Sequence, residues 1–157
     1  MRQARKSKER ARLNSIYGHL YSPHISDHLP HSLGCFYCGD IAQTKDHSPP
    51  LAWVETKKQK EWRDDGIEFL TVRSCSWCNI KLGEKPLFTL AERSAFIEKT
   101  LMRQYEKESA LWSEDEILEM SSAFQKTIRA RKKAIAELLT RARTAEWRKI
   151  REMAGCF

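Results

Sequence analysis

Apolar residues recur at intervals of three and four in the last part of the chain, which is typical of helices that bury one face. Two segments, Thr89-Leu-Ala-Glu92 and Ser113-Glu-Asp-Glu116, match the capping box. In that motif a hydroxyl and a glutamate three residues later satisfy the unpaired amides that open a helix. The sequence therefore predicts two helices, over residues 90–111 and 114–153.

The second predicted helix is long, because about 40 residues without an internal Gly or Pro span about 60 Å. Its apolar stripe is interrupted by Arg131. The stripe comprises Ile117, Met120, Phe124, Ile128, Ile135, Leu138, Ala142 and Ala145. Such a face needs a partner. The first helix supplies part of one in an antiparallel hairpin, and the sequence leaves open a homodimer through the C-terminal helices.

The middle of the chain has a different texture, with cysteines, tryptophans and short β-prone runs such as residues 68–73 between turn residues. Upstream, residues 19–34 are rich in His, Ser and Pro and show no period, as in an irregular linker. We therefore expect three parts: a basic N-terminal arm and linker over residues 1–34, a compact core over 35–87, and a helical extension over 88–157. The expected fold class is α+β.

The net charge of the chain and its distribution indicate a class of binding partner. The 157 residues include 28 Lys and Arg against 21 Asp and Glu, a net charge of +7, which favours a polyanionic partner such as DNA. Residues 1–12 hold six basic side chains against Glu9 alone, and residues 126–157 hold ten against three acids. There is no run of 18 apolar residues and no apolar signal core at the N-terminus. We expect no membrane association and a cytoplasmic location.

Four of the five cysteines form two Cys-x-x-Cys pairs that are separated by 36 residues. These four are Cys35, Cys38, Cys75 and Cys78. Two such knuckles supply the four thiolates of a tetrahedral zinc site. Because four thiolates leave no open coordination position, we expect the zinc to be structural, with one ion per chain. Disulfides are disfavoured by the expected compartment, and nothing resembles the βαβ context of a redox pair.

Since that zinc would be structural, any chemistry must lie elsewhere. Asp46 and His47 follow the first knuckle, and Asn79 follows the second directly. A carboxylate suits a hard divalent cation such as Mg²⁺, and an imidazole that titrates near neutrality can deprotonate a water molecule. An Asp-His dipeptide alone is most often an exposed turn.

The order of these motifs is more specific than any one of them. It runs Cys-Phe-Tyr-Cys-Gly from residue 35, Thr-Lys-Asp-His-Ser-Pro-Pro from residue 44, and Val-Arg-Ser-Cys-Ser-Trp-Cys-Asn-Ile-Lys-Leu-Gly from residue 72. Over residues 35–86, a third of its length, the chain resembles the HNH endonucleases, in particular the subgroup with zinc knuckles. Compact members of that family are common in phages and mobile elements, which implies a bacterial or phage-infected host cell.

The resemblance implies a ββα-metal core. A strand would end near Asp46 and His47, a second would cover about residues 68–74, and a short helix would open near Trp77 and end near Gly83. Asp46 and Asn79 would bind one catalytic Mg²⁺ or Mn²⁺, and His47 would be the general base. DNA phosphodiester bonds, in double-stranded DNA by expectation, would be cut to 5′ phosphates and 3′ hydroxyls.

The chain departs from the family in one respect. The family usually carries an Asn on the second strand that orients the base, whereas residues 48–78 contain no Asn. Asp65, Glu68 or Thr71 are the candidates to replace it, and the main chain is another.

The basic ends of the chain are the candidate surface for the DNA backbone. From the last helix we single out Arg129, Lys132, Lys133, Arg141 and Arg148. Two other functions remain open on the sequence: a non-catalytic, zinc-containing nucleic-acid-binding module, and an interaction protein built on the helical hairpin.

Overall fold

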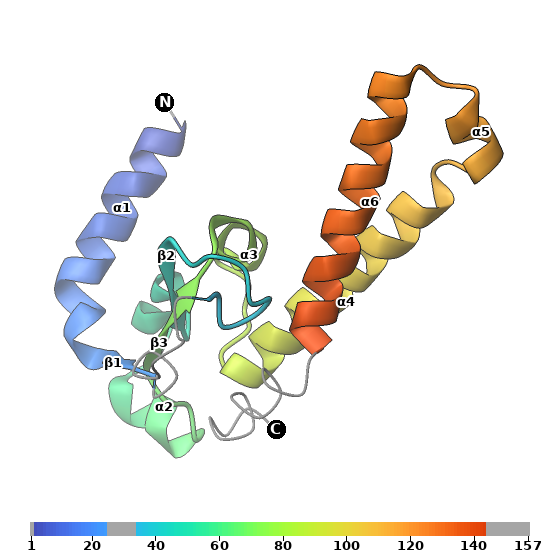
Figure 1. Cartoon of the computed structure of the whole chain (residues 1–157). Coiled ribbons are helices and arrows are strands. Elements are labelled where there is room, and N and C mark those ends of the chain that lie inside the picture. Colours follow the sequence, from blue (N-terminus) through green and yellow to red (C-terminus); the bar gives the residue numbers. More distant parts are fainter. Residues whose placement is uncertain (1, 25–33, 144–157) are drawn as a thin grey trace.

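The structure, a computed structural model, describes residues 2–24 and 34–143, with side chains from residue 7 onward. Its element order is helical, then a small sheet with short helices, then helical again (Figure 1). The α+β fold class is confirmed. Arg148 and residues 144–153 of the second predicted helix lie outside the described residues.

The basic N-terminal arm is a helix, α1 (Arg2–Tyr17). Its charged sequence shows little apolar periodicity, and a tertiary contact fixes it. Leu13 is buried with Tyr21, Leu51 and Val54, the last two from η3 (Leu51–Thr56). Arg12 also donates to Glu55 across 3.1 Å. The arm is therefore packed beside the middle of the chain.

Three strands form one sheet in the order β1-β3-β2. β2 (Thr44–Ser48) and β3 (Leu70–Ser74) are antiparallel, with Asp46 opposite Val72 and His47 opposite Thr71. β1 (Ser22–Pro23) adds a short parallel strand on the far side of β3. It lies within the segment that was expected to be an irregular linker. The sequence did not predict it because a parallel pairing of two residues leaves no periodic pattern. β2 is thus an edge strand, and η3 and α2 (Gln59–Asp64) connect it to β3.

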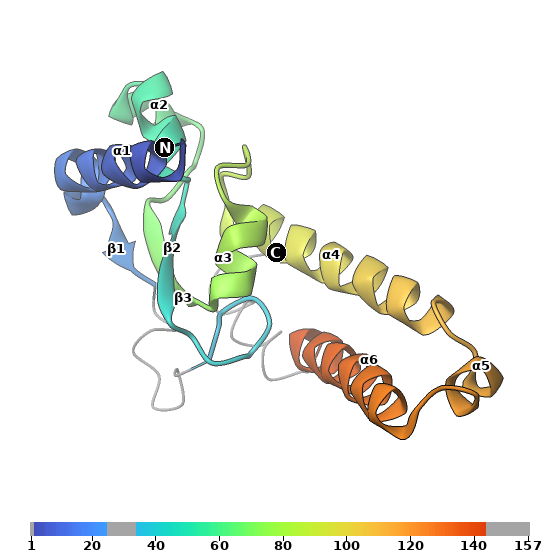
Figure 2. The same ribbon diagram turned by 90° about the horizontal axis from the view of Figure 1, so that it is seen from above.

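α3 (Ser76–Leu82) follows β3 directly, close to the predicted helix near Trp77. It ends at Gly83, whose φ of +49° lies in the left-handed region that glycine adopts without a steric cost. In Figure 2, α3 lies beside β2 and β3, on the opposite side of the strands from α1.

The C-terminal part is an antiparallel hairpin of α4 (Leu90–Ala110) and α6 (Ser122–Arg143) that projects from the sheet (Figures 1 and 2). Both predicted capping boxes are present, at Thr89 and Ser113. The predicted single helix over 114–153 is wrong, however, because α5 (Glu114–Leu118) ends and the chain turns before α6. The Gln125 side chain donates to the main-chain oxygens of Leu118 and Met120, which satisfies carbonyls left open by this break.

One apolar cluster joins the sheet to the hairpin. Tyr37 and the four knuckle cysteines pack with Leu82 of α3, Ile97 and Leu101 of α4, and Leu139 and Ala142 of α6. The root of the hairpin therefore shares a core with the cysteine knuckles. In the described residues no helix is long and apolar enough to cross a membrane.

Candidate functional site

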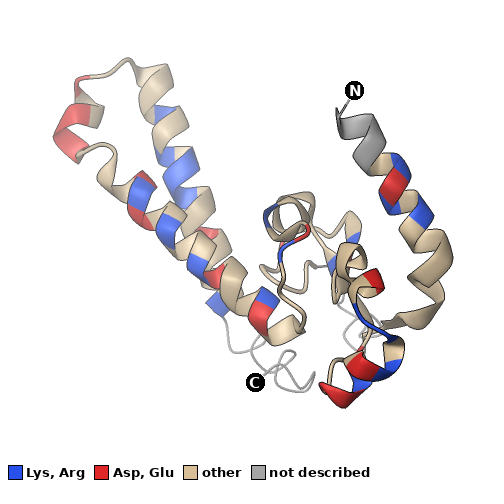
Figure 3. Ribbon diagram, turned by 180° about the vertical axis from the view of Figure 1, so that it is seen from behind, with Lys and Arg blue, Asp and Glu red and all other residues tan. Residues whose placement is uncertain are grey.

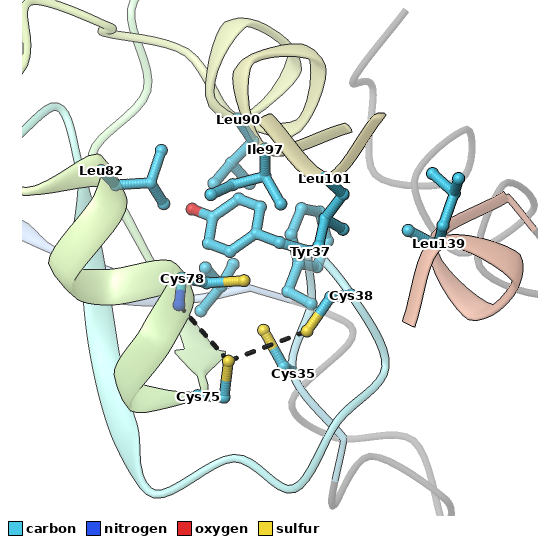
Figure 4. Packing of buried hydrophobic residues seen from close by; sticks show 13 residues of the cluster. Cys35, Tyr37, Cys38, Cys75, Cys78, Leu82, Leu90, Ile97, Leu101 and Leu139 are labelled. Carbon is cyan, nitrogen blue, oxygen red and sulfur yellow. Dashed lines mark hydrogen bonds between the residues drawn. The ribbon is translucent and has the colours of Figure 1, made fainter. Parts of the chain in front are cut away.

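Two turns bring the four knuckle cysteines together. In the first, the amide of Gly39 donates to the Cys35 oxygen across 2.8 Å, and Gly39 takes a φ of +73°. In the second, Cys75 is the N-cap of α3 and its Sγ accepts from the Cys78 amide across 3.4 Å. All four side chains are buried and none is in a disulfide. Figure 4 shows the sulfurs gathered beneath Tyr37.

The spacing of the sulfurs fits a tetrahedral ion. All four Sγ atoms lie within 4.8 Å of one another, and Cys38 Sγ is 3.7 Å from Cys75 Sγ. Zn–S bonds of about 2.3 Å in a tetrahedron place neighbouring sulfurs about 3.8 Å apart, whereas a disulfide needs about 2.05 Å. The predicted cluster of Cys35, Cys38, Cys75 and Cys78 is confirmed as a buried group that could hold zinc.

Asp46 points into the protein from β2 and belongs to a buried polar network. Arg93 of α4 donates to both of its carboxylate oxygens, from Nε to Oδ2 across 2.8 Å and from Nη2 to Oδ1 across 2.7 Å. Tyr37 donates its hydroxyl to Oδ2 across 2.5 Å. The side chains of Arg93 and Asp46 are 0% and 4% exposed. The strand, the first knuckle and the hairpin therefore meet at one carboxylate.

Burial and charge shift the pKa of both partners of Asp46. Burial raises the pKa of Tyr37 well above its ordinary value, and the neighbouring carboxylate raises it further, so Tyr37 remains a hydrogen-bond donor. Burial opposes the charge of Arg93, but the Asp46 carboxylate outweighs it and the pKa of Arg93 is raised. The pair is thus a charged one, held by two parallel hydrogen bonds.

Asn79 of α3 faces β2. Its Nδ2 donates to Thr44 Oγ1 across 3.0 Å and to the Lys45 main-chain oxygen across 3.2 Å. These bonds tie α3 to the edge strand and use the nitrogen of the amide. The amide oxygen is the atom that stays available to a cation.

His47 lies beside Asp46 but in a different environment. Its ring meets the edge of Tyr21, with centroids 4.8 Å apart. Desolvation lowers the pKa of His47 to about 4, and the nearby charges of Arg10, Arg93 and Lys45 also lower it, against the effect of Asp46. The imidazole is therefore neutral at pH 7.

The Nδ1 atom of His47 is buried and makes no hydrogen bond within the described residues. Nδ1 is therefore shielded from water, which leaves Nε2 as the candidate atom for a general base. Thr71 lies opposite His47 in the sheet but does not hold Nδ1. Asp65 and Glu68 do not hold Nδ1 either, so among the described residues none of the three candidates fills the orienting role that the resemblance to HNH endonucleases implies.

These three residues share one cleft. Asp46, His47 and Asn79 line a cavity of about 750 Å³ together with residues from α1, η3 and the turn after α3. The carboxylates of Glu9, Glu55 and Glu84 also line it, and Arg10 is the basic residue in its wall. Two of these acids, Glu9 and Glu55, pair with Arg12, and among the described residues the cysteine cluster is the group found close enough to hold a metal ion.

The basic residues singled out on α6 are mostly engaged within the chain. Arg129 lies 3.3 Å from Glu114, Lys133 3.9 Å from Glu137, and Arg141 3.8 Å from Asp40. Lys132 donates to the main-chain oxygen of Trp112 across 2.7 Å. Figure 3 shows that this basic helix lies next to the acidic α5 and the mixed charges of α4. The charge that α6 offers to DNA is smaller than its sequence indicates.

One residue of this region escaped the sequence analysis. Arg93 stands at a core position of α4, between Leu90 and Ile97, and is fully buried. An arginine on the apolar face of a helix is a signal of a buried anion, because an unpaired charge there is too costly. Arg10 belongs to the basic N-terminal end that the sequence analysis named as a candidate DNA surface, but its place in the wall of this cleft was not predicted. Comparisons of the chain with protein-family models, curated proteins and solved structures gave no match.

Proposed function

We propose that the protein is a metal-dependent endonuclease of the HNH type, which hydrolyses phosphodiester bonds in DNA. One observation carries the proposal: Asp46, His47 and Asn79 line a single cleft beside a cysteine cluster that could hold zinc. The succession of β2, β3 and α3, with Cys75 and Cys78 at the start of α3, is compatible with the ββα-metal core that the resemblance implies.

His47 is the proposed general base. Nε2 would accept the proton of a water molecule that then attacks the phosphorus. Because no acceptor among the described residues holds Nδ1 and fixes the tautomer, and because desolvation lowers the pKa of the ring to about 4, His47 is a weak base. We expect slow turnover for this reason.

Asp46 and Asn79 are the proposed ligands of Mg²⁺ or Mn²⁺. Oδ1 of Asp46 accepts one hydrogen bond, from Arg93, and keeps a lone pair, and the oxygen of Asn79 is available. A cation held there would neutralise negative charge as it develops on the phosphate oxygens. Arg93 and Tyr37 would hold the carboxylate in place, as hydrogen-bonding partners commonly do for metal ligands.

A second function has its own support. Both oxygens of Asp46 are already bound by Arg93, so the carboxylate has a complete structural role without a cation. This favours a non-catalytic module that binds nucleic acid and contains zinc. In that case His47 and Asn79 would serve packing alone.

Nicking of supercoiled plasmid DNA in Mg²⁺ or Mn²⁺ separates the two functions. We expect the zinc-loaded wild type to nick and His47→Ala to lose at least about 100-fold in rate, while gel retardation stays unchanged and the protein remains folded by circular dichroism. His47 is the residue of choice, because Asp46→Ala would leave Arg93 buried without its partner. If the wild type retards DNA but does not cut it, whichever divalent ion is added, the protein is the non-catalytic binding module.

The cation site has a direct test. In crystals soaked with Mn²⁺, we expect anomalous scattering between Asp46 and Asn79 that is distinct from the signal of zinc at the cysteines. Absence of that signal, with zinc present, would contradict the proposed ligands.

A further inference from the structure

A second cavity, of about 720 Å³, adjoins the cleft beneath α1. The two cavities share Arg10, His47 and Leu51, so that Arg10 and His47 stand at the boundary between them. Both are of the size that holds small ligands. The motifs of the sequence do not account for the second cavity, because most of its lining comes from α1 and the residues that follow it.

The two cavities differ in the sign of their charge. Three glutamates line the first, Glu9, Glu55 and Glu84, together with Asp46, whose carboxylate is turned inward to Arg93. Among the described residues that line the second, none is Asp or Glu. Arg10, Lys45 and His19 line it instead. One cavity thus has ligands for a cation, and its neighbour has donors for an anion.

The basic side chains that line the second cavity are available to bind an anion. Arg10 and Lys45 are exposed, and neither pairs with a carboxylate among the described residues. This contrasts with Arg12 on the same helix, which lies 2.8 Å from Glu9 and 3.1 Å from Glu55. Both Arg10 and Lys45 are near enough to His47 to lower the pKa of its ring. Their positive charge is therefore directed to the boundary of the two cavities.

Uncharged donors complete the second cavity. Ser7, Asn14 and Thr71 line it with side chains that can donate hydrogen bonds. An arginine, a lysine and several neutral donors around a space without carboxylates form a binding set for phosphate oxygens. An acidic peptide would use the same charges, but the shared wall with the His47 cleft favours a chain whose phosphates recur at short intervals.

We propose that the cavity beneath α1 is a phosphate subsite of a nucleic-acid strand, in which Arg10 and Lys45 bind a phosphate neighbouring the one at His47. This deepens the proposed function and rests on it for the identity of the strand. The sequence analysis gave the backbone contact to both basic ends of the chain, and the proposal narrows it to Arg10 of α1 together with Lys45 of β2.

The test measures binding without cleavage. A fluorescein-labelled 12-base-pair DNA duplex is titrated with zinc-loaded full-length protein, with no other divalent ion, and anisotropy gives Kd at several salt concentrations. We expect Arg10→Gln and Lys45→Gln each to raise Kd about tenfold and to reduce the salt slope by about one. Lys8→Gln is the matched control, since it removes one charge from an exposed position of α1 that lines neither cavity; we expect a change below about twofold.

Two results would overturn the subsite. One is an equal loss of affinity for Lys8→Gln, Arg10→Gln and Lys45→Gln, which would mean that only the overall charge of α1 matters. The other is a Kd that none of the three changes. Thermal midpoints should be the same in all four proteins, because the three side chains are exposed.

The source of the phosphate is tested by competition. Inorganic phosphate and an acidic hexapeptide are added to the complex of protein and duplex. A strand subsite predicts displacement only at millimolar or higher phosphate and none by the peptide at that concentration. Displacement by micromolar phosphate, or by the peptide, would overturn the strand as ligand. If the protein never nicks DNA but gives the expected binding results, the subsite is supported and the nuclease proposal fails. If the protein nicks DNA but Arg10→Gln and Lys45→Gln leave Kd unchanged, the subsite proposal fails and the nuclease proposal stands.

Discussion

The sheet with its knuckles and the helical hairpin are held together by different means. Around the sheet, short elements meet at four cysteines and at the buried network of Asp46, Arg93 and Tyr37. The hairpin has long helices, two complete capping boxes and an apolar seam that includes Ile128 and Ile135. The first region depends on buried polar side chains and on cysteines that could hold zinc, which are far apart in the sequence, and the second on local pattern and apolar packing. The two regions should therefore respond differently to substitution.

Loss of the cysteine cluster should separate the two regions most sharply. Cys75→Ser removes one thiolate, and structural zinc sites contribute on the order of 10 kcal/mol to folding. We expect the sheet region to unfold while much of the helical signal of the hairpin persists. Near-ultraviolet circular dichroism should lose its bands, with far-ultraviolet helicity reduced only in part and zinc content near zero. Full retention of both signals in a zinc-free protein would show that the cluster is not a structural metal site.

Breaking the ion pair between the regions should have the next largest effect. Arg93→Met leaves the Asp46 carboxylate buried without the guanidinium that pairs with it, which should lower the free energy of unfolding by about 3–5 kcal/mol. Arg103→Met, at an exposed position of the same helix, should be nearly neutral. Urea unfolding followed by tryptophan fluorescence measures both. Addition of Asp46→Asn to Arg93→Met should recover part of the loss; if it recovers none, the pair does not explain the destabilisation.

Truncation of the hairpin seam should have a comparable or smaller effect. Leu139→Ala removes a side chain that is 6% exposed and belongs to the shared core, at a cost of about 2–5 kcal/mol. Leu118→Ala in α5, where the leucine is 62% exposed, should change stability by less than about 0.5 kcal/mol. Thermal unfolding compares the two. Equal losses would mean that the tip of the hairpin is buried in solution, as in a homodimer.

The smallest effect is expected at a cap. Ser113→Ala removes the hydroxyl that accepts from the Glu116 amide across 3.2 Å, at a cost of about 1 kcal/mol. Ser109→Ala, on an exposed position of α4, supplies the control for the substitution itself. Hydrogen exchange of the α5 amides should increase only in the Ser113 variant. Exchange that rises across the sheet as well would contradict the separation of the two regions.

The same contrast explains what the sequence predicted. Local signals identified α4, both caps and the cysteine cluster, because each depends on residues close in the chain or on a spacing with a fixed chemistry, whereas the short helix that ends near Gly83 was implied by the resemblance to HNH endonucleases. The partner of Asp46 was not predicted, since Arg93 reaches it across 47 positions and belongs to another element. The end of α5 was missed because Gln125 closes it with side-chain bonds that no periodicity records. α1 depends on the burial of Leu13 by residues of η3, which is a tertiary contact.

The link between Arg93 and Asp46 has a practical consequence for dividing this protein. A fragment that stops before α4 would retain every motif of the knuckle region. It would, however, expose the apolar side of Tyr37 and leave the buried Asp46 carboxylate without Arg93. Such a fragment would fold poorly and tend to aggregate, and an inactive preparation of it would say nothing about the intact chain. The motif-bearing segment and the start of the hairpin should therefore be expressed, crystallised and assayed as one piece.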